Sequence, residues 1–518
     1  MKHLSYIIII LLVALSSCRK DFDTSLSNGN LSFSQDSLFF NRVFDDISSS
    51  THSFTVKNNS NDAISVPNIS LERGNSSFYR LNIDGISGKS FQDVTILAKD
   101  SIFVFAEVTV DFDQVTEPMA MYTDKILFDN GSNEQKVELE AQVLDIHLIR
   151  PNRTAIIDGF NYENIILGQD AEGNDITIRG TNLVNSTTWS NDKPYLIYNY
   201  VGVPNGKTLT IEAGTKLYFH QNSGIIVQPG GKLIVNGTLE NQVVFQGDRL
   251  EEDFAEIPGQ WGTIWLMEGS QNSEINYATI KNATIGLLVD SNLDTPNLTL
   301  TAHNLQIYNT TSFGIFARNA KIVAKNTVIS NNGTSSLSIA LGGNYNFYHS
   351  TIANYWNSSN RQNPTFNLSD SYDVQGGYIS QEVNANFTNC IIYGNQNKEF
   401  FLENKDTSFA FDVNFTNCLI KFNDTDNEFE NNPLFNFSNT TTTIYQNIIL
   451  NQNPNFFKTN NDDDGQINLI IGDDSFANNQ AETSVLTDVI LQKDILGIDR
   501  SIGASDIGAY QHITFEDD

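Results

Sequence analysis

The pentapeptide Asn-Phe-Thr-Asn-Cys occurs twice, at residues 386–390 and 414–418. Local function rarely needs the same peptide twice, so the duplication indicates structural repetition. A wider apolar pattern that ends in isoleucine recurs at Ile280, Ile307, Ile329, Ile352, Ile392 and Ile420. These isoleucines lie 27, 22, 23, 40 and 28 residues apart. Such spacing is typical of a solenoid, in which stacked rungs share one continuous core.

Upstream of these repeats, Gly206–Arg249 alternates apolar triplets such as "LTI", "LYF" and "IIV" with turns that contain Gly and Asn. Each triplet predicts a short strand, and the frequent turns favour a parallel coil in which each rung pairs with the next. The two pentapeptides then occupy equivalent places in successive rungs. Their asparagines can form an amide ladder. We expect Cys390 and Cys418 to be buried free thiols, because in-register neighbours seldom reach disulfide geometry.

Three further stretches carry a family resemblance. They are residues 189–238, which begin "WSNDKPYL", "PGQWGTIWL" (Pro258–Leu266) and "DILGIDRSIGASDIGAYQ" (Asp494–Gln511). With them the sequence resembles a right-handed parallel β-helix of the pectate-lyase-like superfamily. The resemblance implies such a β-helix, a solenoid, over residues 185–512, followed by an acidic tail at 513–518.

Residues 31–145 follow a different rule, in which apolar and polar residues alternate with period two. The clearest runs are Thr51–Ser60, Ser101–Val110, Asp124–Asn130 and Lys136–Asp145. Alternation with turn residues between the runs predicts half-buried antiparallel strands. The segment resembles the Ig-like β-sandwich spacers of bacterial surface proteins. The expected fold class is therefore all-β, with a connecting segment at 146–184 between the two domains.

The N-terminus predicts a leader. An apolar stretch, Tyr6–Leu15, follows a short basic start and is too short to span a bilayer comfortably. "LSSC" at residues 15–18 resembles the bacterial lipoprotein lipobox, which implies a signal peptide at 1–17 and lipidation of Cys18. Residues 18–30 would form the tether. Arg19 stands where an inner-membrane retention signal would have Asp, and "RKDFD" at residues 19–23 resembles the surface-export tags of some lipoproteins. We therefore expect a lipid-anchored location on the outer membrane, facing outward.

The charge restricts the partners. Acidic residues outnumber basic ones 61 to 30, and the formal net charge is -31. Such a surface repels nucleic acid and polyanionic substrates, so no nucleic-acid partner is expected.

The sequence offers no catalytic constellation. No histidine lies between glycines and no Arg-x-Lys occurs, although enzymes that resemble polygalacturonases need both beside clustered carboxylates. Arg318, with Lys321 and Lys325, is the nearest basic group in a rung, and ordinary solvated charges explain these residues better. We therefore assign no catalytic residue.

The 40-residue gap between Ile352 and Ile392 predicts an insertion, Asn354–Tyr378, that leaves the coil as a long loop. Long loops on a rigid scaffold often carry function. The ligand-binding candidates are Tyr355, Trp356, Arg361, Tyr372, Asp373 and Tyr378, which suit stacking on sugar rings or docking of a protein. The alternative is a loop whose aromatic side chains pack back on its own rungs.

Two acidic segments remain. Asn460, Asp462 and Asp464 partly match an EF-hand-type Ca²⁺ loop, but Ile471 stands where a bidentate glutamate is expected. An acidic surface turn is the alternative, and no other cofactor is indicated. Gly247–Gly259 is most simply a solvated loop.

Two functions follow from these patterns. The first is a non-catalytic surface lipoprotein whose β-helix serves glycan binding, adhesion or scaffolding of a surface complex. The second is a polysaccharide lyase or glycoside hydrolase that acts on an extracellular glycan. The missing constellations and the negative charge favour the first.

Overall fold

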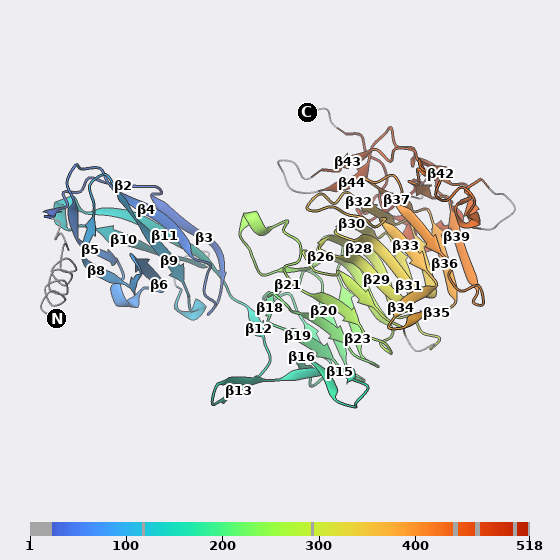
Figure 1. The fold of residues 1–518 in the computed structure, drawn as a ribbon, viewed down its shortest axis with the longest axis horizontal. Coiled ribbons are helices and arrows are strands. Elements are labelled where there is room, and N and C mark those ends of the chain that lie inside the picture. Colours follow the sequence, from blue (N-terminus) through green and yellow to red (C-terminus); the bar gives the residue numbers. More distant parts are fainter. Residues whose placement is uncertain are drawn as a thin grey trace, which may run out of the picture. The chain divides into compact units, whose positions relative to one another are not determined.

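The computed structural model describes residues 23–115, 120–291, 295–438, 444–460, 467–500 and 505–515. The chain divides into two units, Met1–Asp145 and Ile146–Asp518 (Figure 1). Strands and short 3-10 helices make up the regular structure of the described residues, so the predicted all-β class is confirmed. None of the described segments forms a helix long and apolar enough to cross a membrane.

The first unit is a sandwich of two sheets. One sheet has the order β1-β5-β10-β11-β3, with β8 beside β5. Its strands are β1 (Ser25–Leu26), β3 (Ser37–Phe44), β5 (Ile64–Leu71), β8 (Ser90–Ile96), β10 (Met121–Phe128) and β11 (Gln135–Leu144). The other sheet comprises β2 (Leu31–Phe33), β4 (His52–Asn58), β9 (Ser101–Val108), β6 (Tyr79–Ile83) and β7 (Ile86–Gly88). Three 3-10 helices, η1 (Gly74–Ser76), η2 (Phe112–Gln114) and η4 (Gly131–Asn133), lie in its connections.

Period-two alternation builds this core. In β10 every second residue is buried, and β4, β9 and β11 follow the same rule. Val56 and Val104 of one sheet join Ile126 and Leu139 of the other in a single apolar cluster. The four predicted strand runs are confirmed, while the Ig-like assignment of the sandwich stays a prediction.

The second unit coils three columns of parallel strands around one core (Figure 1). Column 1 contains β12 (His147–Ile149), β18 (Tyr195–Ile197), β21 (Lys216–Phe219), β24 (Val243–Gly247), the ends of β26 (Ser273–Lys281) and β28 (Leu300–Thr310), β30 (Val328–Asn332), β32 (Thr351–Asn354), β37 (Ile391–Gly394), β40 (Leu419–Ile420) and β42 (Ile449–Leu450). Column 2 contains the end of β16 (Asp175–Asn182), β19 (Tyr200–Val203), β22 (Gly224–Val227), β25 (Thr263–Leu266), β27 (Leu287–Val289), the starts of β29 (Phe313–Lys325) and β31 (Ser335–Tyr348), β33 (Phe366–Ser369) and β38 (Phe400–Glu403). Column 3 contains β17 (Thr187–Trp189), β20 (Thr208–Glu212), β23 (Lys232–Asn236), the remaining halves of β26, β28, β29 and β31, β36 (Val383–Thr388), β39 (Phe411–Thr416) and β41 (Tyr445–Gln446).

The isoleucine register is confirmed in column 1. Each of the six isoleucines pairs directly with the next, from Ile280 through Ile420. All six side chains are fully buried. The uneven spacing along the sequence therefore reflects loops of different length between strands that keep one register.

The repeated pentapeptide occupies equivalent places in β36 and β39. Asn386 pairs with Asn414, and the Asn414 Nδ2 donates to Asn386 Oδ1 at 3.2 Å. The rings of Phe387 and Phe415 stack at 5.0 Å. Cys390 and Cys418 are buried free thiols. The peptide is repeated because it builds the same piece of scaffold twice.

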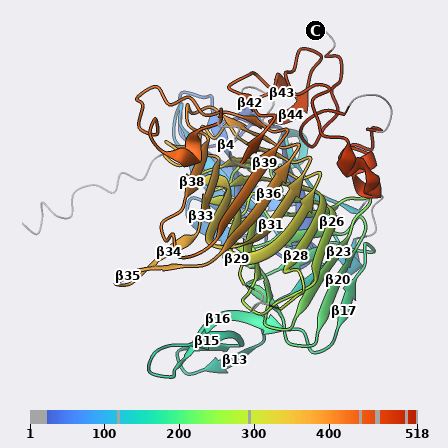
Figure 2. The ribbon, with the colours of Figure 1, turned by 90° about the vertical axis from the view of Figure 1, so that its right-hand side faces the viewer.

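The insertion between Ile352 and Ile392 differs from the predicted single loop. After an excursion at residues 355–365, β33 returns to column 2 and pairs with β31 and β38. The chain then leaves again as a hairpin, β34 (Ser371–Val374) and β35 (Gly377–Ser380), which projects from the coil (Figure 2). Phe366 and Leu368 bury their side chains in the core, which explains why this segment returns to the coil.

The predicted connecting segment 146–184 also differs, because β12 and β16 already join the coil. Between them lie a hairpin of β13 (Arg153–Ile156) and β14 (Gly159–Tyr162), and β15 (Asn164–Gln169), which pairs with β16. At the other end, β43 (Phe456–Lys458) pairs with β44 (Asn468–Ile471). The remaining short helices are η5 (Glu252–Phe254), η6 (Pro433–Phe435), η7 (Ser484–Thr487) and η8 (Val489–Gln492).

Candidate binding surface

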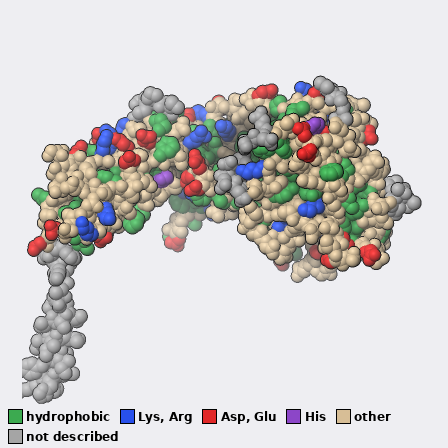
Figure 3. Space-filling model, turned by 90° about the horizontal axis from the view of Figure 1, so that it is seen from above, with side chains coloured by type: hydrophobic (Ala, Val, Ile, Leu, Met, Phe, Trp, Pro, Cys, Tyr) green, Lys and Arg blue, Asp and Glu red, His purple; other side chains and the backbone are tan. Residues whose placement is uncertain are grey.

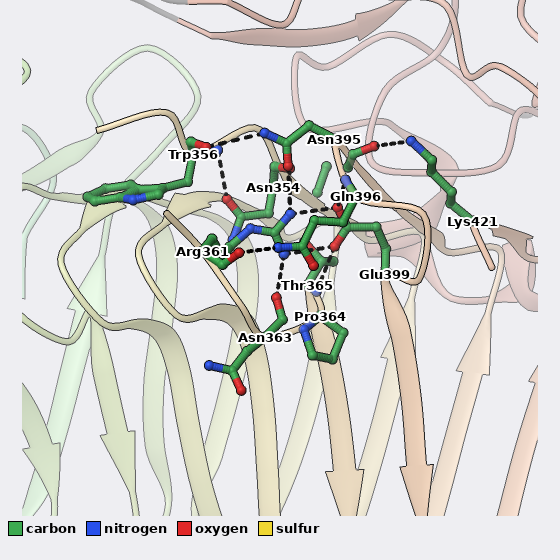
Figure 4. A network of polar contacts seen from close by, with 12 residues as sticks. Asn354, Trp356, Arg361, Asn363, Pro364, Thr365, Asn395, Gln396, Glu399 and Lys421 are labelled. Carbon is green, nitrogen blue, oxygen red and sulfur yellow. Dashed lines mark hydrogen bonds and ion pairs between the residues drawn. The ribbon is translucent and has the colours of Figure 1, made fainter. Parts of the chain in front are cut away.

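Arg361 is buried in the insertion and serves the scaffold. Its guanidinium forms two hydrogen bonds with Glu399, at 2.6 and 2.8 Å, and these side chains are 2% and 0% exposed. Figure 4 shows Asn363 and Asn395 around the same guanidinium, which donates to both at 2.7 and 2.8 Å. Because both terminal nitrogens of its guanidinium are engaged inside the protein, Arg361 does not face a ligand in this structure.

Tyr355 and Trp356 also turn inward. Trp356 is 6% exposed and its Nε1 donates to Ser359 Oγ at 2.9 Å. The ring of Tyr355 packs edge-on against Phe456. In the first half of the insertion, these two aromatic side chains therefore pack against other parts of the protein.

The other three candidates lie on the projecting β34–β35 hairpin. Tyr378 is 44% exposed and Tyr372 is half-buried. Asp373 forms an ion pair with Lys405 at 2.9 Å, and the Lys405 Nζ lies 4.4 Å from the centroid of the Tyr378 ring. The hydrogen bond from Lys405 to Asp373 raises the pKa of Lys405. The hairpin thus carries two tyrosine rings and a charged pair at the surface.

Column 2 places a second charged pair beside this hairpin. Arg318 donates to both carboxylate oxygens of Asp290, at 2.6 and 2.8 Å, and Trp265 Nε1 donates to the same carboxylate at 2.7 Å. The Arg318 guanidinium lies 5.6 Å from the centroid of the Tyr372 ring. Burial opposes the charge of Arg318, but the bonds to Asp290 outweigh burial and raise its pKa.

Together these residues form one surface, which we call the hairpin face. It comprises Trp265, Asp290, Phe316, Arg318, Tyr372, Asp373, Tyr378 and Lys405. Its aromatic rings can stack on sugar rings, and its polar side chains can bond hydroxyl groups. Its two carboxylates are already bound to cations, so neither is poised for proton transfer.

An ion pair between a histidine and an aspartate elsewhere in the coil also lacks the geometry for catalysis. His220 Nδ1 lies 2.7 Å from Asp248 Oδ2, and the bond to Asp248 raises the pKa of His220. The nearby hydroxyl of Ser223 donates to the backbone carbonyl of His220 rather than to its ring. This trio is therefore not a nucleophile–base–acid arrangement.

The metal candidates fall at the edge of what the structure describes. Asp462 and Asp464 lie outside the described residues, and Asn460 is the last residue before that gap. Ile471, at the twelfth position of the motif, is buried in β44. Across the described ranges, no group of three or more His, Cys, Asp or Glu side chains could hold a metal ion. Calcium binding stays a prediction, and Cys18 likewise lies outside the described residues.

Sequence reasoning missed four members of the hairpin face, namely Trp265, Asp290, Phe316 and Lys405. The signal was the register: Val289 pairs with Ala317, so the residues that follow, Asp290 and Arg318, are neighbours on adjacent rungs. Spacing alone did not reveal that pairing, because column 2 lacks the isoleucine repeat that marks column 1. On the face seen in Figure 3, Lys and Arg of the described residues are dispersed among acidic and uncharged side chains.

Comparisons with known proteins agree with the coil. A family described as "Pectate-lyase like beta helix domain" matches residues 181–289, from the end of β16 to β27. This part of the second unit is therefore similar to a pectate-lyase-like β-helix domain. A search of the curated proteins finds no match.

Several solved structures match weakly. A PapD-like domain of human CEP192 is 10% identical, with a TM-score of 0.16, over 25% of this chain and 96% of that one. The catalytic unit of a GH87 α-1,3-glucanase from Streptomyces thermodiastaticus is 11% identical, with a TM-score of 0.25, over 71% and 74%. The periplasmic alginate epimerase AlgG is 8% identical, with a TM-score of 0.18, over 48% and 78%. At such scores the likeness carries no argument about activity.

Proposed function

We propose that this protein is a non-catalytic surface lipoprotein whose hairpin face binds a glycan. The observation that supports this most is the position of Tyr372 and Tyr378 on a projecting hairpin, each beside a charged pair. A carbohydrate site needs flat apolar rings for the sugar faces and fixed polar groups for the hydroxyls. Adhesion and scaffolding of a surface complex would use the same exposed face.

The charges on this face favour an uncharged or weakly charged glycan. Arg318 and Lys405 are each paired with a carboxylate, so neither leaves a net positive site. The net charge of -31 would repel a polyuronate from a distance. A neutral polysaccharide meets neither obstacle.

Removing both tyrosine rings tests the site. We expect Tyr372→Ala/Tyr378→Ala to weaken glycan binding by about 10-fold or more. Aromatic side chains that a ligand covers on binding contribute much of the binding free energy at such interfaces. The full chain carrying Cys18→Ser would be mixed with neutral and acidic polysaccharides in the presence of Ca²⁺. Size exclusion would then follow protein elution and polymer length together.

The matched control removes two exposed rings elsewhere. Phe103 and Phe105 of β9 are 56% and 39% exposed, and Phe103→Ala/Phe105→Ala should leave co-elution unchanged. Co-elution that survives loss of the two tyrosines would refute the assignment of the hairpin face. The absence of co-elution across the panel would leave a protein partner or a structural role.

A polysaccharide lyase or hydrolase is the second candidate. The pectate-lyase-like β-helix domain supports it, since such a fold hosts enzymes as well as inert spikes. Shortened polymer in the same size-exclusion experiment would establish this alternative and refute the non-catalytic proposal.

Lipid anchoring at Cys18 is a separate proposal, supported by the lipobox-like "LSSC" at residues 15–18. We place the protein on the outer membrane with the coil facing outward. Cys18→Ser should release the protein from the membrane fraction, because two or more acyl chains supply the anchor. Fractionation followed by immunoblotting measures this, with Cys390→Ser as the control. Retention of the Cys18→Ser protein in membranes would contradict the proposal.

A further inference from the structure

A cavity of about 440 Å³ lies on the outside of column 1, away from the hairpin face. One wall is the coil itself, where Gln306 and Tyr308 of β28 pair with Val328 and Ser330 of β30. The opposite wall is the β43–β44 hairpin, drawn near β30 and β32 in Figure 1. The rest of the lining is Glu256, Asn309, Asn331, Leu496 and Tyr510. Its volume is in the range of small-molecule sites.

The acidic segment Gly247–Gly259 contributes Glu256 to the lining of this cavity and is fixed to the coil. The Asn282 Nδ2 donates to the backbone carbonyl of Ala255 at 2.8 Å. Lys281 lies 3.7 Å from the Glu256 carboxylate, and Asn309 also donates to that carboxylate. The sequence predicts a solvated loop here, and Glu252, Asp253 and Ile257 are exposed. The segment also brings one carboxylate, already paired with a cation, to the cavity.

The C-terminal segment supplies another wall. Ala509 N donates to Thr351 Oγ1 of β32 at 3.0 Å, which fixes the neighbouring Tyr510 against column 1. Tyr510 is 7% exposed. Tyr308 and Tyr510, which are far apart in the sequence, thereby line one space.

Three hydroxyl groups line this cavity without a protein partner. Within the ranges that the structure describes, the hydroxyls of Tyr308, Ser330 and Tyr510 make no hydrogen bond. Burial raises the pKa of both tyrosines, so each hydroxyl stays protonated and can donate as well as accept. The three hydroxyls are open to the cavity, so a ligand rich in hydroxyls could bond to them in place of water.

The remaining lining is mixed. Val328, Phe457, Leu469 and Leu496 are apolar, and they stand beside polar side chains, namely Gln306, Asn309, Asn331, Lys458 and Asn468. A lining that combines apolar side chains with hydroxyl and amide groups matches a sugar ring, which has C–H faces and hydroxyl edges. Glu256, the carboxylate of the lining, is paired with Lys281, and Lys458, the cation of the lining, also has an interaction within the protein. Neither charge therefore calls for a charged ligand.

We propose that this cavity binds one uncharged sugar residue through the hydroxyls of Tyr308, Ser330 and Tyr510. The proposal is independent of the hairpin face, which lies on column 2 and contains none of these residues. Such a site would hold the end or a side branch of a glycan, since its volume accommodates a ring rather than a polymer.

The test uses methyl glycosides of glucose, galactose, mannose, xylose and N-acetylglucosamine with the full chain carrying Cys18→Ser. Saturation-transfer NMR and titration calorimetry would measure binding. We expect at least one methyl glycoside to bind, and Tyr308→Phe/Tyr510→Phe to weaken that binding by about 10-fold, because two hydrogen bonds are lost while both rings remain.

Two control variants show whether the sugar binds in this cavity or elsewhere on the protein. Tyr393→Phe removes a hydroxyl on β37, in the same column but outside the cavity, and should bind as the parent does. Tyr372→Ala/Tyr378→Ala, on the hairpin face, should also leave this binding unchanged. The proposal is overturned if no methyl glycoside binds, if the double phenylalanine variant binds equally well, or if the hairpin-face variant abolishes binding.

Discussion

Glu399→Gln should lower the free energy of unfolding of the coil by about 3–5 kcal/mol, because it leaves the buried Arg361 cation without its counter-charge. The side chains of Arg361 and Glu399 are 2% and 0% exposed. Glu399 also accepts from the backbone N–H groups of Thr365 and Gln396, at 2.9 and 2.7 Å. The pair therefore fixes the excursion at residues 355–365 to the turn that precedes β38.

Urea unfolding followed by tryptophan fluorescence measures the effect in the right unit, because all four tryptophans lie in Ile146–Asp518. Glu274→Gln is the control, since the Glu274 side chain is 56% exposed in its ion pair with Lys232 and should cost less than about 1 kcal/mol.

A variant that replaces both charged residues shows whether the loss of stability comes from the unpaired Arg361 charge. Arg361→Met/Glu399→Leu should be more stable than Glu399→Gln, because no unpaired charge remains buried. A loss below about 1 kcal/mol for Glu399→Gln would show that the pair does not hold the insertion.

The periodic part of the fold could be predicted because its signal is local. In each rung the isoleucine belongs to a short apolar run with a turn after it. The isoleucines of successive rungs pair directly, which keeps them aligned in column 1. Period-two alternation likewise identified β4, β9, β10 and β11. In both cases, neighbours in the sequence carry the information about which side chains face the core.

The insertion and the binding surfaces depend on partners distant in sequence. Arg361 was a ligand-binding candidate in the sequence analysis. Its partner, Glu399, could not be recognised there because it lies 38 residues away and belongs to no repeat. β33 was missed because its four residues are too few to reveal a period. The cavity near Tyr308 and Tyr510 forms only when the C-terminal segment folds back on the coil.

One corner of the coil departs from the asparagine pattern in an informative way. Asn326 and Asn389 have φ values of 51° and 58°, and His349, with a φ of 45°, holds the equivalent place on the rung between them. The imidazole is fully buried. Its Nε2 lies 2.8 Å from Asn389 Nδ2, and its Nδ1 lies 3.3 Å from the carbonyl of Gly508. Accepting on Nε2 while donating from Nδ1 requires the neutral ring.

Burial, together with the nearby Arg500 cation, lowers the pKa of His349 well below its ordinary value. The unfolded chain takes up a proton at this residue near the ordinary histidine pKa of about 6.5, whereas the folded ring stays neutral. The unfolded state therefore binds more protons as the pH falls below that value, and stability decreases. Each pH unit below it removes up to about 1.4 kcal/mol for this one group.

His349→Asn should remove this contribution and restore the amide ladder, because asparagine accepts a positive φ at the neighbouring corners. Between about pH 7.5 and pH 5, the unfolding free energy of the variant should gain about 2 kcal/mol relative to the parent. Urea unfolding with tryptophan detection at several pH values measures that difference. Burial also lowers the pKa of His303, but His303 is present in both proteins and cancels. Parallel pH profiles for parent and variant would contradict a buried neutral His349, whatever the absolute stability of the variant.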